Sequence, residues 1–135
     1  LIGMPEIYFL PKTCGIVDER GEIAAMYKGI PQNDIGINSD VINNVSKSIG
    51  INMLIRSMGP QIIICDEIGS KEDVEAIEKA TLSGVKGVFT AHASSIEEIR
   101  QNPNLNKLIV NKKIQRIIIL DSINKGKIKQ VEKIE

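Results

Sequence analysis

The chain has 135 residues, of which 42% are hydrophobic, and this length is enough for one domain with a substantial core. Its 17 basic and 17 acidic residues cancel, which argues against the broad basic surface of a nucleic-acid-binding protein. Aromatic residues make up only 3% of the chain, so a stacking platform for single-stranded nucleic acid is not expected either. We therefore expect a single domain over residues 1–135 and no nucleic-acid partner.

The two cysteines, Cys14 and Cys65, both lie in apolar runs typical of strands. This placement favours buried free thiols in a reducing compartment over a disulfide or a metal pair. No apolar run approaches the ~20 residues of a membrane-spanning helix, and no signal peptide is visible. Because the chain begins at Leu1 rather than Met, we expect a trimmed amino end or a fragment.

The amino-terminal third alternates between apolar runs and polar segments. Residues 1–13 show no clear period and are expected to be an irregular remnant. Residues 14–18 predict a short strand, and carboxylates follow it. Residues 30–44 are rich in Asn, Gly, Asp and Pro, which predicts an irregular surface loop of a length that is often functional.

A helix is predicted before Gly59 and Pro60, which would end it. Arg56 lies off the apolar stripe of this helix. The stripe has the i, i+3, i+4, i+7 spacing of one helical face and consists of Ile51, Leu54, Ile55 and Met58.

Three further helices have recognisable starts. Ser70 followed three residues later by Asp73 is close to a capping box. Ser94 with Glu97 predicts the start of a short helix, and Pro103 predicts the start of another.

The central apolar run, residues 61–65, is bounded by a proline and runs directly into Asp66 and Glu67. Such a run predicts a strand buried on both faces, as in parallel sheets. Residues 85–91 predict a further strand that delivers His92. Residues 114–135 predict a terminal antiparallel hairpin with a turn at residues 124–126.

Strands and helices thus alternate through most of the chain, which predicts an α/β fold with a mostly parallel, doubly wound sheet and an antiparallel end. Polar groups follow three strands: residues 18–22, the pair Asp66 and Glu67, and His92. Because ligands bind beyond the carboxyl ends of parallel strands, we expect these groups to converge. Acids, a histidine and nearby arginines together indicate a phosphoryl-transfer site. A strand ending in Asp-Glu suits Mg²⁺ binding by the first carboxylate and water activation by the second, although an acidic surface turn would give the same pattern.

Five short motifs occur in order along the chain: Ile-Val-Asp-Glu-Arg-x-Glu-Ile-Ala at 16–24, Gly-x-Pro-Gln-Asn-Asp-x-Gly at 29–36, Leu-Ile-Arg-Ser-Met at 54–58, Asp-Glu-Ile-Gly at 66–69 and Thr-Ala-His at 90–92. Together they make residues 14–120 similar to the stage III sporulation protein AA family. Its members are secretion-type ATPases, RecA-like relatives of the type II secretion and type IV pilus motors. The resemblance implies a RecA-like P-loop NTPase core, incomplete at its amino terminus, that uses ATP and Mg²⁺.

The resemblance also implies roles for individual residues. The matches are Asp66 and Glu67 with the Walker B position, Glu19 and Glu22 with the acidic box, His92 with the histidine box, and Arg56 with an arginine that reaches a phosphate at a subunit boundary. Asp66 would then bind the metal, and Arg20 with Asp66 would contact the cofactor. Each match has a structural alternative, because the acidic box could be a solvated charge cluster, His92 a helix cap and Arg56 a solvated side chain.

The phosphate loop of that family, Gly-x-x-x-x-Gly-Lys-Thr opening a helix, does not match this chain. Lys12 and Thr13 resemble its end, but Pro11 stands where the glycine should be. One hypothesis is therefore a fragment of a motor subunit that forms homo-oligomeric rings at the cytoplasmic, mother-cell side and powers a sporulation channel of membrane-embedded proteins. The alternatives are a non-catalytic RecA-like scaffold and a relative of the type II secretion or type IV pilus motor.

Overall fold

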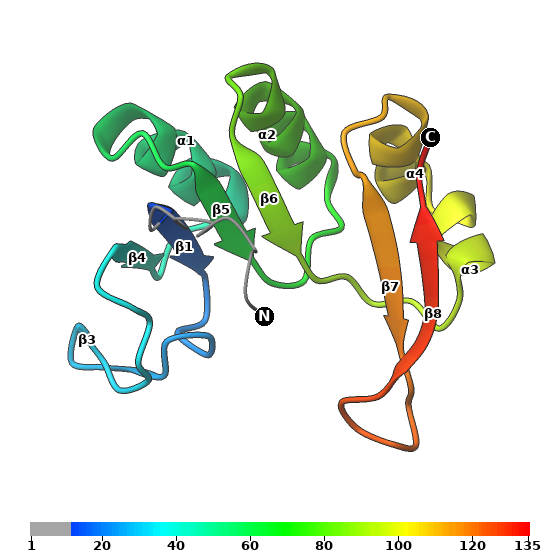
Figure 1. Ribbon diagram of the computed structural model, residues 1–135. Helices are drawn as coiled ribbons and strands as arrows, with labels where there is room; N and C mark the ends of the chain where they lie inside the picture. Colours follow the sequence, from blue (N-terminus) through cyan, green and yellow to red (C-terminus); the bar gives the residue numbers. More distant parts are fainter. Residues whose placement is uncertain (1–11) are drawn as a thin grey trace, which may run out of the picture.

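The computed structural model describes residues 12–135 (Figure 1). The predictions for residues 1–11 lie outside the described residues. A parallel sheet has the strand order β4-β1-β5-β6, formed by β1 (Cys14–Asp18), β4 (Ser39–Asn43), β5 (Ile62–Cys65) and β6 (Lys86–Phe89). The expected mixed α/β fold with a mostly parallel sheet is confirmed.

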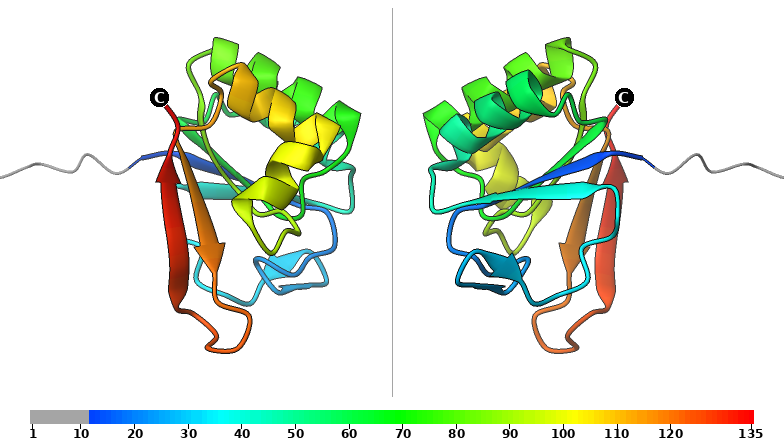
Figure 2. Two further views of the ribbon diagram at one scale, coloured as in Figure 1. Left: turned by 90° about the vertical axis from the view of Figure 1, so that its right-hand side faces the viewer. Right: turned by 90° about the vertical axis from the view of Figure 1, so that its left-hand side faces the viewer.

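Helices α1 (Lys47–Ser57) and α2 (Lys71–Leu82) lie side by side on the same face of this sheet (Figure 2). Val17 and Ile63 project from the sheet into the core beneath them and are 0% and 1% exposed. A Cβ atom at Gly50 of α1 would lie 2.6 Å from Cγ1 of Val17. Only glycine therefore allows α1 to approach β1 this closely.

The opposite face of the sheet is partly open within the described residues. Ile62 and Ile64 of β5 are only half-buried, while Ile63 and Cys65 of the same strand are buried. The prediction that this strand is buried on both faces is therefore wrong. The reason is that α1 and α2 both cover one face (Figure 2).

The expected loop over residues 30–44 contains two strands. Pro31 and Ile30 form β3 (Ile30–Pro31), which pairs with β2 (Met26–Tyr27), and β4 adds an edge strand parallel to β1. The prediction of an irregular loop is wrong here, because backbone hydrogen bonding to β1 outweighs the turn preference of the Asn- and Asp-rich sequence.

Helix ends follow the predicted local chemistry closely. The Ser70 hydroxyl accepts a hydrogen bond from the Asp73 amide, and Oδ2 of Asp73 accepts one from the Ser70 amide, which completes a capping box at α2. Gly59 follows the end of α1 with a φ of +58° and donates its amide to the Leu54 carbonyl. None of the helices within residues 12–135 combines the length and apolar character needed to cross a membrane.

Helix α3 (Ile96–Gln101) begins one residue later than predicted. Its N-cap is Ser95, whose hydroxyl accepts from the Glu98 amide, whereas the amide and hydroxyl of Ser94 both donate to the Glu98 carboxylate. Either of the two adjacent serines could cap the helix by residue type. Ser94 instead bonds the Glu98 carboxylate, which leaves Ser95 as the N-cap. Helix α4 (Pro103–Val110) begins at Pro103 as predicted.

The predicted carboxy-terminal hairpin is present as β7 (Arg116–Leu120) and β8 (Ile128–Lys133). It forms its own two-stranded sheet next to β6 (Figure 1). Its inner face packs on α3 and α4 through a small core of Ile96, Ile109, Ile117 and Ile119.

Candidate functional site

The carboxyl edge of the sheet, where β1, β5 and β6 end, brings together side chains from three separate loops. Nη2 of Arg20 lies 2.5 Å from Oε2 of Glu67, and Nε2 of His92 lies 3.2 Å from Oε1 of the same carboxylate. Arg20 follows β1, Glu67 follows β5, and His92 follows β6. The convergence expected from the strand order in the sequence therefore occurs, with Glu67 at its centre.

The loop after β1 is held from within by Asp18. This side chain is fully buried, and its carboxylate accepts hydrogen bonds from the backbone amides of Glu22 (2.8 Å), Ile23 (3.1 Å) and Ala24 (2.9 Å). The turn that results directs Arg20 toward Glu67. Asp18 thus organises the acidic box without facing a ligand.

The acidic box contains two carboxylates with different surroundings. Glu19 forms an ion pair with Lys47, the first residue of α1, whose side chain is 13% exposed. Glu22 is solvent-exposed and lies 3.5 Å from Arg20. Burial is the largest single effect and lowers the pKa of Lys47, but the hydrogen bond with Glu19 and the attraction of nearby anionic groups together raise the pKa above its usual value, so this lysine is charged.

Lys47 was not among the residues singled out in the sequence. A cation at the first position of a helix is unfavourable next to the positive end of the helix dipole. That conflict is the one sequence feature that indicates a local anionic partner, and the structure supplies it in Glu19.

The charge state of Glu67 follows from its two partners. The hydrogen bond from Arg20, followed by that from His92, holds the pKa of the Glu67 carboxyl below its usual range. The same bond raises the pKa of Arg20. In this arrangement the carboxylate is stabilised as an anion and is a weak proton acceptor.

Asp66 offers carboxylate oxygens at the same edge. Its side chain is 17% exposed, and Nη2 of Arg20 lies 4.0 Å from its Oδ2. No cluster of three or more potential metal ligands occurs within the described residues. A metal ion held here would therefore rely on Asp66 together with water or ligand oxygens, which is the usual way that proteins bind Mg²⁺.

Arg56 is not brought to this edge. It lies exposed in the last turn of α1, which ends at the amino edge of the sheet shortly before β5 begins. Within one chain, Arg56 and Glu67 are therefore at opposite ends of the sheet.

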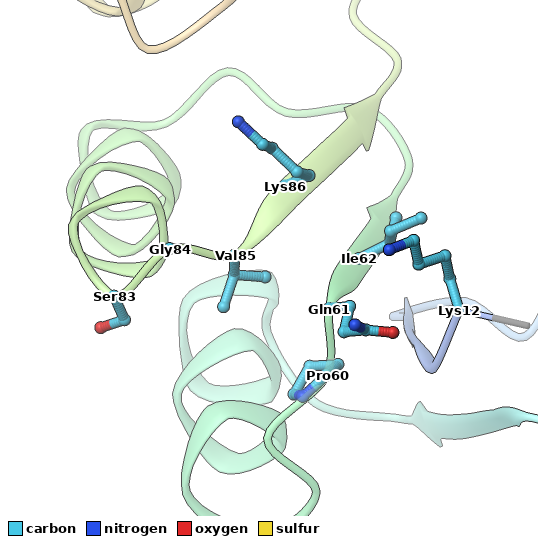
Figure 3. Close-up of a pocket in the computed structure, with 8 residues that line it drawn as sticks. All are labelled: Lys12, Pro60, Gln61, Ile62, Ser83, Gly84, Val85 and Lys86. Atoms are coloured by element: carbon cyan, nitrogen blue, oxygen red, sulfur yellow. The ribbon is translucent and has the colours of Figure 1, made fainter. Parts of the chain in front are cut away.

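Cavities among residues 12–135 include the following two, which lie in different parts of the molecule. One of about 420 Å³ is at the amino edge, where β5 and β6 begin (Figure 3). The other, of about 340 Å³, borders the candidate site and is lined by His92, Ala93, Ser94, Glu98, Leu120, Ser122 and Lys129. The second cavity shares His92 with the candidate site, and this histidine bonds the Glu67 carboxylate.

Residues 6–134 match the family model described as sporulation stage III, protein AA. The stage III sporulation protein AA of Bacillus subtilis (strain 168) is 41% identical over 111 residues, which are 82% of this chain and 36% of that protein. A solved structure with a similar fold is the VirB11 ATPase of the Brucella suis type IV secretion system in complex with sulphate. It superposes with a TM-score of 0.60 at 15% identity, and the match covers 90% of this chain and 40% of VirB11. The Legionella pneumophila ATPase DotB superposes with a TM-score of 0.52 at 15% identity, and the match covers 80% of this chain and 40% of DotB. The fold is thus that of RecA-like secretion ATPases, and the chain spans well under half of each of these proteins.

Proposed function

We propose, because the chain belongs to the sporulation stage III protein AA family, that it forms the water-activating half of an ATP-hydrolysing motor that powers a sporulation channel. The observation that carries this proposal is the Glu67 carboxylate, placed beyond the central strand β5 and held between Arg20 and His92. A carboxylate in this position has the geometry of a general base at the end of a parallel strand.

The residues of the carboxyl edge have different roles in the proposed hydrolysis. Glu67 accepts a proton from the attacking water once Arg20 has left it, because the loss of that hydrogen bond restores its basicity. Arg20 then becomes available to an anionic phosphate oxygen, and His92 keeps the Glu67 carboxylate oriented. Glu19 stays paired with Lys47 and fixes the loop that carries Arg20.

Asp66 fits the metal ion that nucleotide hydrolysis requires, since its oxygens are largely free of other partners within residues 12–135. A bound Mg²⁺ would neutralise charge that develops on the transferred phosphoryl group. Binding of the phosphates is a different matter, because Arg20 and Lys47, two cations near this edge, are paired with carboxylates. A glycine-rich loop with its own lysine has to supply that binding.

Assembly into a homo-oligomeric ring would give Arg56 a role at a subunit boundary. It is exposed at the amino edge and distant from its own site, which suits contact with a neighbouring copy better than an action within the chain. An arginine that completes a neighbour's site stabilises charge in the transition state. Membrane-embedded sporulation proteins would be the partners of such a ring at its cytoplasmic, mother-cell side.

The test uses a version of the protein that carries a Gly-x-x-x-x-Gly-Lys-Thr loop ahead of β1. Glu67→Gln should lower the rate of ATP hydrolysis by about 10²-fold or more while leaving Mg-ATP affinity within a few-fold, because glutamine keeps the shape but accepts no proton. Glu75→Gln is the matched control, since Glu75 is an exposed carboxylate on α2 whose ion pair is with Lys71. Hydrolysis by Glu67→Gln within a few-fold of the parent would refute the role of Glu67 and favour Glu22.

A non-catalytic scaffold is the second candidate. The pairing of Arg20 with Glu67 favours it, because it leaves the site neutralised by its own residues. If the loop-bearing version binds Mg-ATP tightly but hydrolyses none, with Glu67 and Arg20 intact, the scaffold function is the better description.

A further inference from the structure

Glu67 has an unusual backbone conformation. Its φ is +47°, in the left-handed region that side chains other than glycine seldom adopt. A non-glycine residue in this region is strained and persists only where surrounding contacts hold it. The contacts that hold Glu67 therefore determine where its carboxylate lies.

Thr90, the residue that follows β6, brackets this turn with three hydrogen bonds. Its amide donates to the Cys65 carbonyl (3.2 Å), its carbonyl accepts from the Ile68 amide (2.8 Å), and Oγ1 accepts from the amide of Glu67 itself (2.9 Å). The first two bonds are made by the backbone and would survive any side chain. The third depends on the hydroxyl and is the one that reaches the strained residue.

The same segment also carries His92, two residues later, which bonds the Glu67 carboxylate. Thr90 thus fixes the backbone of Glu67 from the strand that supplies one of its two side-chain partners. Arg20, the other partner, comes from the opposite side through the loop after β1.

We propose that Thr90 is a positioning residue, whose hydroxyl holds Glu67 in the left-handed conformation so that its carboxylate meets Arg20 and His92. The importance of this role rests on the proposed function of Glu67. The hydrogen bond from the Glu67 amide to Thr90 does not depend on that function. Thr90 touches no reacting atom and acts only through Glu67.

The experiment compares Thr90→Val, which removes the acceptor and keeps the branched shape, with Thr90→Ser, which restores it. Thr81→Val is the matched control, because the Thr81 hydroxyl donates to the Ile77 carbonyl within α2, away from the site. Two signals are measured by NMR on the chain without nucleotide: hydrogen exchange of the Glu67 amide, and the guanidinium resonances of Arg20, which separate when rotation is hindered by an ion pair. Glu67→Gln shows how the Arg20 signal looks when that charged pair is lost.

In Thr90→Val the Glu67 amide should exchange about tenfold faster, the loss expected for one hydrogen bond. The Arg20 resonances should move toward those of Glu67→Gln, while Thr90→Ser and Thr81→Val should match the parent. Exchange within twofold of the parent in Thr90→Val, or an unchanged Arg20 signal, would overturn the proposal. A drop in global stability without these local changes would also overturn it, because it would show a purely structural role. Neither signal requires hydrolysis, so a failure of the proposed function would leave this result independent.

Discussion

Asp18 is the buried group on which the loop of the candidate site most depends. Its carboxylate accepts three backbone hydrogen bonds in a fully buried position. In Asp18→Asn the amide oxygen can keep the two bonds from Glu22 and Ile23, but the amide nitrogen then faces the Ala24 amide, donor against donor. We expect the substitution to lower the free energy of unfolding.

The magnitude follows from the count of bonds. A hydrogen bond to a charged acceptor contributes about 1.5–3 kcal/mol, and a buried donor left without an acceptor costs about 1–3 kcal/mol. Because Ala24 is itself 0% exposed, water cannot replace the lost acceptor there. Asp18→Asn should therefore lower the free energy of unfolding by about 2–4 kcal/mol, a large part of the roughly 5–15 kcal/mol typical of a domain.

Urea unfolding followed by circular dichroism measures this difference at neutral pH. Asp121→Asn is the matched control: Asp121 also accepts two backbone amides, from Ile123 (2.7 Å) and Asn124 (2.9 Å), but in an exposed turn of the hairpin where water can take over. Its effect should be clearly smaller. Equal losses for the two variants, or none for Asp18→Asn, would refute the argument that burial makes the Asp18 bonds important.

Two other predictions concern pH and ligand binding. Glu78 of α2 accepts from Lys107 (2.8 Å) and Asn111 (2.6 Å), and these bonds hold its pKa below the usual value of 4.5. A lowered folded-state pKa gives stability that is present above pH 4.5 and is lost as pH falls through the folded-state value. Glu78→Gln should therefore have a free energy of unfolding about 1 kcal/mol below that of the parent at pH 7. Urea unfolding of both proteins should show this difference shrinking in acid. The chain as given should bind Mg-ATP weakly or not at all by calorimetry. Its sequence has no match to the phosphate loop, whose amides and lysine make the strong charge-assisted hydrogen bonds to phosphate. Micromolar affinity would contradict this.

Features fixed by neighbours in sequence were the ones that the sequence predicted well. The capping box of Ser70 and Asp73 and the helix start at Pro103 need only residues a few positions apart. The edge strand β4 was missed because its formation depends on β1, twenty or more residues away, and not on its own composition. The uneven burial of β5 was missed for a similar reason, since the placement of both helices on one face is a property of the whole fold.

The candidate site shows the same division. That residues after β1, β5 and β6 should meet at one edge followed from the order of strands and helices alone. That Arg20 bonds Glu67, or that Glu19 pairs with Lys47, depends on side-chain positions that no spacing rule gives. Thr90 belongs to the Thr-Ala-His motif, but its role could not be read from the sequence, because the strained backbone of Glu67 that its hydroxyl contacts is visible only in the structure.

Under the proposed function, the pairing of charges at the carboxyl edge would leave the binding of the phosphates to a separate phosphate loop. Arg20 is bound by Glu67, and Lys47 is bound by Glu19, so neither cation is free to attract a phosphate from a distance. The first pair is largely exposed, and exposed ion pairs contribute little to stability, so a phosphate held firmly by other groups can replace Glu67 as the partner of Arg20. The second pair is less exposed on its lysine side and anchors the loop to α1. The Arg20–Glu67 pair is therefore suited to exchange and the Lys47–Glu19 pair to hold the loop in place. Under the proposed function, the exchange that gives Arg20 a phosphate partner would also free Glu67 to accept a proton.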